Sequence, residues 1–132
     1  MNTIDCHTEQ PGEFPQVIAT RGHTFRADAL PADSTDSAPG AHDYFDASLA
    51  ACKALTATWY AKRKQIPLER VDVHVERDDK EERQGHYRLQ VRLSFHGPLS
   101  GEQRDALFRA VSACPIHKLM TTTEVHIETA LG

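Results

Sequence analysis

The sequence has little of several features that mark particular classes of protein. It holds only 3 cysteines, and this odd number argues against paired disulfides and for thiols kept reduced in a cytosol. No stretch approaches the ~20 apolar residues of a membrane-spanning helix, and the polar N-terminus does not read as a signal peptide. The 15 Lys and Arg are outnumbered by 19 Asp and Glu, so the basic excess of a nucleic-acid-binding protein is missing. We therefore expect a cytoplasmic protein that binds neither nucleic acid nor a membrane.

The length of 132 residues also limits the organisation of the chain. A chain of this size can bury one hydrophobic core but not two. Residues 1–13 contain Pro11-Gly12 and few apolar side chains, which predicts a flexible N-terminal arm. We expect a single domain over residues 14–132.

The sequence pattern predicts two hairpins and a final strand. Two β-prone runs flank Gly22, and the segments 71–75 and 87–95 alternate apolar and polar residues with a period of two. The charged segment 78–85 would form the tip of the second hairpin. A shorter alternation at Val125 and Ile127 predicts the last strand.

Three helices are predicted between and after these strands. Residues 43–64 contain no Gly or Pro, and Phe45, Leu49, Cys52, Leu55 and Trp59 follow helical spacing. This helix is so apolar that we expect it to be covered by the sheet and by a partner subunit.

The second helix begins after Ser100, whose spacing to Gln103 predicts a capping box. A short third helix over 116–120 follows Cys114-Pro115. The predicted order is ββ-α-ββ-αα-β, an α+β arrangement.

The cysteines are the main candidates for chemistry. Cys52 lies in the middle of the long apolar helix, where it could be a small buried side chain or a reactive thiol. Cys114 lies at the start of a helical turn, where backbone N–H groups and the helix dipole would lower its pKa. If the two thiols were close together, they could cycle between a dithiol and a disulfide. Cys6, on the predicted arm, is interpreted as incidental.

A reactive thiolate also needs a cation beside it and a carboxylate that orients the cation. Arg21 and Arg26 lie on or beside the first predicted hairpin, and Asp43 opens the helix that carries Cys52. Asp43 could equally be a helix-capping residue.

The eight histidines do not form a recognisable metal motif. They are scattered along the chain, without an HExxH or Cys-x-x-Cys pattern. We therefore expect no metal and no cofactor. His117, three residues after Cys114, could be a neighbour of that thiol or an exposed helix residue.

Together these motifs resemble the OsmC/Ohr superfamily of osmotically inducible and organic hydroperoxide resistance proteins, in its less characterised branch. The resemblance covers about residues 14–130. It is carried by Gly22-His23, Asp28, Pro31, Ser37-Ala38-Pro39, Asp43, Leu49-Ala50-Ala51-Cys52 and Ala113-Cys114-Pro115-Ile116.

The resemblance implies an intertwined homodimer in which long central helices pack against antiparallel sheet, with active sites at the dimer interface. It implies an organic hydroperoxide reductase that acts in oxidative-stress defence. The Cys52 thiolate would attack the peroxide and become a sulfenic acid. Cys114 would then form a disulfide with it, which an external dithiol or thiol would reduce.

The sequence departs from the family pattern around the activating charges. The family's peroxidases place a Glu at the start of the Cys-bearing helix to orient an Arg over the thiolate. Here that stretch reads His42-Asp43, and the loop 29–41 contains no Arg, so Arg21 or Arg26 would have to serve. The alternative functions are a non-catalytic dimer that binds a small apolar ligand, and a thiol redox sensor.

Overall fold

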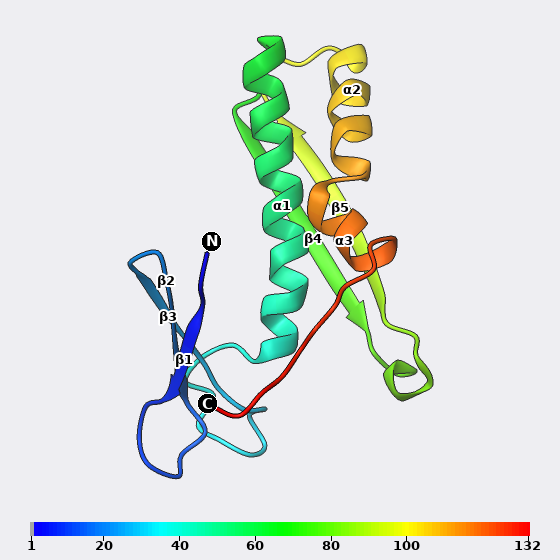
Figure 1. Ribbon diagram of the computed structural model, residues 1–132. Coiled ribbons are helices and arrows are strands. Elements are labelled where there is room, and N and C mark those ends of the chain that lie inside the picture. The colour runs from blue at the N-terminus through cyan, green and yellow to red at the C-terminus, as the bar shows by residue number, and fades with distance from the viewer. Residues whose placement is uncertain (1) are drawn as a thin grey trace. The chain divides into compact units, whose positions relative to one another are not determined.

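The computed structural model describes residues 2–132, which form two compact units (Figure 1). The first unit ends at Phe45 and the second begins at Asp46. Antiparallel strands and three α-helices make up the chain, which confirms the predicted α+β class. The prediction of a single domain over 14–132 stays a prediction.

The first unit is built on an antiparallel sheet of three strands, in the order β1-β2-β3. The strands are β1 (Asp5–Thr8), β2 (Gln16–Thr20) and β3 (His23–Ala27). Arg21 and Gly22, with φ of 50° and 82°, form the two-residue turn of the predicted hairpin. Positive φ at both turn positions matches the twist of the paired strands.

Strand β1 falls in the segment that was predicted to be a flexible arm. Its backbone pairs with β2, with Asp5 opposite Ala19 and Thr8 opposite Gln16. The side chains of β1 are all exposed, so the strand has no apolar alternation for a sequence pattern to detect. Edge pairing of this kind depends on backbone hydrogen bonds rather than on a buried face.

Helix α1 (Ala41–Lys64) is the longest element and continues from the first unit into the second. The Asp43 carboxylate accepts a hydrogen bond from the Gly40 N–H (2.9 Å), and the last turn carries three basic residues. Negative charge at the start and positive charge at the end both suit the helix dipole.

The buried face of α1 differs from the predicted one. Within the chain it consists of Leu49, Lys53, Ala57 and Ala61, one residue every four positions. Of the predicted apolar stripe only Leu49 is buried, whereas Leu55 and Trp59 are 70% and 58% exposed. Spacing alone does not say which side of an apolar helix meets the rest of its own chain.

The second unit packs α1 and α2 (Gly101–Ser112) against a hairpin of β4 (Arg70–Asp78) and β5 (Arg88–His96) (Figure 1). The hairpin has the predicted alternation, and a 3-10 turn over Glu82–Gln84 lies in its charged tip. Leu107 and Val111 of α2 are fully buried against Ala57 and Ala61.

Polar contacts tie the tip end of this hairpin to α1. The Asp46 carboxylate accepts hydrogen bonds from Arg77 Nε (2.6 Å) and from the Tyr87 hydroxyl (2.7 Å). Burial, followed by the hydrogen bond to Asp46, raises the pKa of Tyr87 to about 12. These contacts hold the Asp46 turn of α1 against the end of β4 and the residue that precedes β5.

The predicted capping box of α2 is confirmed. The Gln103 N–H donates to the Ser100 hydroxyl (3.1 Å), and the Ser100 N–H donates to the Gln103 side chain (2.9 Å). Helix α3 (Pro115–Thr121) follows with Cys114 as its N-cap residue, close to the predicted position.

The predicted last strand is wrong. Residues 123–132 form no helix or strand, and Val125 and Ile127 are 58% and 83% exposed. Two alternating apolar residues do not make a strand without a neighbouring strand to pair with.

In the described chain, no helix is long and apolar enough to span a membrane.

We predict that Leu107→Ala lowers the free energy of unfolding by about 2–5 kcal/mol, because it leaves a cavity in the packed core. Urea denaturation followed by circular dichroism measures the change. Leu119→Ala is the matched control, since Leu119 is 45% exposed and should cost far less. Equal losses for the two variants would contradict the assignment of the core.

Candidate thiol site

Cys52 and Cys114 lie together where α1 meets the start of α3. Cys52 is half-buried on α1, and its Sγ accepts a hydrogen bond from the Ile116 N–H (3.5 Å). Cys114 is 1% exposed, and the neighbouring Cys52 thiol contributes to the rise of its pKa. The structure therefore brings the two cysteines together from distant parts of the sequence.

The pKa of Cys114 is raised, which corrects the sequence-based prediction that it is lowered. Burial of the thiol is the largest cause, and the hydrogen bond with Cys52 adds to it. The predicted backbone effect is present, because the His117 N–H hydrogen-bonds to the Cys114 thiol and lowers its pKa. That contact is too weak to offset the removal of the thiol from water.

A buried lysine lies next to the two thiols. The Lys53 side chain is 4% exposed, and its ammonium donates a hydrogen bond to the Val111 carbonyl of α2 (2.8 Å). The ammonium is also 3.2 Å from Nδ1 of His117 on α3. Its positive charge lowers the pKa of Cys114, against the effect of burial. His117 is therefore a neighbour of the Cys114 thiol. Its backbone N–H contacts the thiol, and its ring contacts Lys53, whose charge acts on the thiol.

This arrangement suits thiol–disulfide chemistry. Two neighbouring thiols can form a disulfide when the backbone places their Cα atoms about 4.4–6.8 Å apart. The two thiols differ in exposure, so an oxidant from solvent can reach the half-buried Cys52 but not the buried Cys114. Cys6 lies apart on the exposed strand β1.

The other three candidate residues belong to the first unit. Arg21 is exposed in the turn between β2 and β3, and Asp43 contacts the Gly40 N–H at the start of α1. Arg26, on β3, forms an ion pair with Glu9, with its Nε 2.6 Å from the carboxylate. The hydrogen bond and the charge of Glu9 raise the pKa of Arg26. The two cysteines belong to the second unit.

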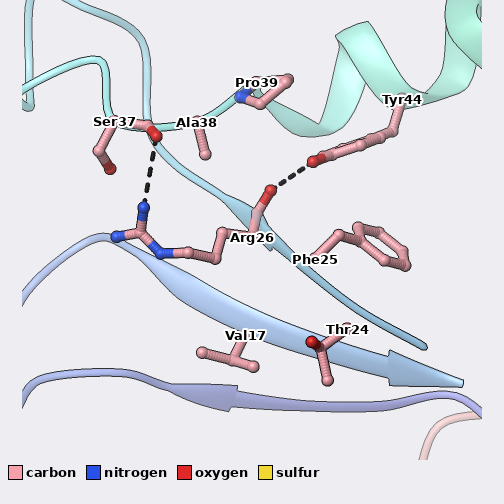
Figure 2. A pocket seen from close by; sticks show the side chains of 8 residues that line it. All are labelled: Val17, Thr24, Phe25, Arg26, Ser37, Ala38, Pro39 and Tyr44. Carbon is pink, nitrogen blue, oxygen red and sulfur yellow. Dashed lines mark hydrogen bonds between the residues drawn. The ribbon is translucent and has the colours of Figure 1, made fainter. Parts of the chain in front are cut away.

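Arg26 also lines a pocket of the first unit (Figure 2). Its guanidinium donates to the Ser37 carbonyl (3.3 Å), and its own carbonyl accepts a hydrogen bond from the Tyr44 hydroxyl. Phe25 packs against the Tyr44 ring, with centroids 5.2 Å apart. The pocket has a volume of about 410 Å³ and is lined by Val17, Thr24, Phe25, Arg26, Ser37, Ala38, Pro39 and Tyr44.

Sequence patterns assigned no role to Lys53, although it is the only charged residue between Ala47 and Ala61. A lone lysine in so apolar a helix indicates a buried lysine with a specific role, because a lysine on a solvent-facing side would normally have polar neighbours. Among residues 2–132, no cluster of three or more His, Cys, Asp or Glu could hold a metal ion.

Comparison with known proteins supports the fold. A search of curated proteins finds no match. Among solved structures, a Psychrobacter arcticus protein thought to act in osmotic stress and detoxification is 16% identical, with a TM-score of 0.77, and the alignment covers 92% of this chain and 90% of that one. An OsmC-like protein from Mycoplasma pneumoniae is 20% identical, with a TM-score of 0.75, over 92% and 88% of the two chains.

The organic hydroperoxide resistance protein OhrB of Bacillus subtilis is 19% identical, with a TM-score of 0.61, over 92% of this chain and 91% of that one. At these low identities, the TM-scores show a shared fold alone. The model of one family, the OsmC-like proteins, matches residues 34–130, which include both cysteines and most of the chain. The chain therefore belongs to the OsmC-like family.

Proposed function

We propose that the protein reduces organic hydroperoxides through its two adjacent thiols and contributes in this way to defence against oxidative stress. The observation that carries the proposal is the position of the half-buried Cys52 beside the start of α3, next to the buried Cys114. Family membership supports it, since solved relatives of the same fold include organic hydroperoxide resistance proteins.

In the first step, the Cys52 thiolate attacks the outer oxygen of the hydroperoxide. An S–O bond forms, the O–O bond breaks, and the sulfur is oxidised by two electrons to a sulfenic acid. The leaving alkoxide takes a proton and departs as an alcohol. The accessibility of Cys52 and the apolar residues around it on α1 favour an organic over an inorganic peroxide.

In the second step, the Cys114 thiol attacks the Cys52 sulfenic acid, forms a disulfide and releases water. The raised pKa of Cys114 keeps this thiol protonated while Cys52 reacts, so the two cysteines have different roles. An external dithiol or thiol then reduces the disulfide by exchange, and its own thiols are oxidised in turn.

We propose Arg21, Arg26 and Asp43 as the groups that orient the peroxide and the thiolate. Glu9 holds the Arg26 guanidinium through two contacts of 2.6 and 3.3 Å. Asp43, whose carboxylate accepts the Gly40 N–H at the start of α1, is the proposed orienting carboxylate.

The proposed functional unit is a cytoplasmic homodimer. Large apolar side chains of α1 and α2 are exposed in the single chain, among them Leu55, Trp59 and Phe108. Burial of such side chains favours association of two copies. Light scattering should give twice the 14.7 kDa mass of one chain.

We predict that the wild-type protein turns over cumene hydroperoxide in the presence of a dithiol, and that Cys52→Ser reduces turnover to the uncatalysed rate. Loss of the nucleophilic sulfur removes the first step. Cys6→Ser is the matched control and should retain full turnover, since Cys6 is exposed on β1. A wild-type protein inactive with every dithiol and monothiol reductant tested would overturn the proposal.

We predict that Cys114→Ser accumulates a sulfenic acid at Cys52 after one equivalent of hydroperoxide, because no second thiol is present to condense with it. A 1,3-dione probe followed by mass spectrometry detects the product. The Cys6→Ser protein should instead form the Cys52–Cys114 disulfide. Absence of any oxidation at Cys52 in both proteins would point to a ligand-binding site.

A further inference from the structure

We propose that the Lys53 ammonium is the cation that stabilises the thiolate of the Cys52–Cys114 pair. The proposal adds a residue to the proposed peroxidase site, and its role in turnover rests on that function. The five residues involved come from three elements: Cys52 and Lys53 from α1, Val111 from α2, and Cys114 with His117 from the start of α3.

Lys53 is an uncompensated buried charge. Its side chain is 4% exposed, and among residues 2–132 no carboxylate lies within ion-pair distance of its ammonium. A buried ion without a counter-charge costs several kcal/mol, so such residues are normally paired. The position belongs to the apolar stripe that also contains Leu49, Ala57 and Ala61, where a leucine would fit the pattern.

The hydrogen bonds of Lys53 do not supply that counter-charge. The Val111 carbonyl accepts one N–H (2.8 Å) and is neutral. An ammonium can only donate, so Nδ1 of His117 (3.2 Å) accepts the second, and the imidazole is then the neutral tautomer with its proton on Nε2. These contacts hold the ammonium in place but leave its charge unbalanced.

The thiols are the groups that can balance it. Lys53 follows Cys52 directly in α1. The Lys53 ammonium contacts the ring of His117, and the backbone N–H of His117 donates to the Cys114 thiol. The charge of Lys53 lowers the pKa of Cys114. Loss of one proton from the pair places a negative charge beside the ammonium, and the remaining thiol can donate its hydrogen bond to that thiolate.

Oxidation removes this charge balance. When the pair becomes a disulfide, the ammonium again lacks a counter-ion, so the oxidised form is disfavoured relative to the reduced form. Reduction takes up two electrons and one proton and gives a thiol and a thiolate. A stabilised thiolate therefore makes the disulfide easier for an external dithiol to reduce. Lys53 would thus assist both attack on the peroxide and regeneration.

The test is a pH titration of the thiolate by its ultraviolet absorbance, in a Cys6→Ser background that removes the third thiol. Two neutral replacements are compared: Lys53→Met, which conserves the length, and Lys53→Gln, which can still donate hydrogen bonds to Val111 and His117. We expect both to raise the first thiol pKa by about 1 unit or more. Lys53→Arg should restore a value closer to the wild type.

Lys118→Met is the matched control, because Lys118 is an exposed lysine on α3 and should leave the titration unchanged. A redox titration against glutathione gives a second readout. The neutral variants should shift the disulfide toward the oxidised form at a fixed ratio of thiol to disulfide, while Lys118→Met should not. Circular dichroism confirms that each variant is folded.

The outcomes separate this proposal from the proposed function. An unchanged first thiol pKa in a folded neutral variant would overturn the role of Lys53, and so would a larger shift in Arg26→Met than in the Lys53 variants. A shift in the Lys53 variants of a protein that reduces no hydroperoxide would support the Lys53–thiolate pair and reject the peroxidase. Neither titration requires a peroxide.

Discussion

The face that α1 presents to the rest of its unit determines both the core and the thiol site. Ala57 and Ala61 are small enough to let α2 approach closely, so Leu107 and Val111 become fully buried. One turn earlier on the same stripe stands Lys53, and the same close approach brings the Val111 carbonyl to its ammonium. The chemistry of the site therefore depends on the packing that stabilises the unit.

Burial and the charge of Lys53 act in opposite directions on the pKa of Cys114, and the proposed mechanism gives the two cysteines different roles. Burial raises the pKa of Cys114, which suits a thiol that must stay protonated until a sulfenic acid appears beside it. Half-burial leaves Cys52 open to an oxidant. A buried ammonium costs free energy in a protein core, and its retention in the apolar stripe is understandable if a neighbouring thiolate offsets that cost.

Sequence patterns predicted the parts of the fold that have a strong local signal. The β4–β5 alternation, the Arg21-Gly22 turn and the capping box at Ser100 depend on neighbouring residues, and the structure confirms them. Strand β1 was missed because an exposed edge strand has no apolar face, and the strand predicted at Val125 has no pairing partner. These two features depend on contacts between distant segments.

Local patterns have the same limit at the candidate site. The two cysteine motifs stood out by their local context, and the structure brings them together. Lys53 was missed because its role depends on helices far along the chain.

The most direct measurement of the proposed thiol chemistry is peptide mapping of the Cys6→Ser protein after one equivalent of cumene hydroperoxide. The account predicts a Cys52–Cys114 disulfide at the expense of both free thiols, and recovery of both peptides as reduced thiols would contradict it.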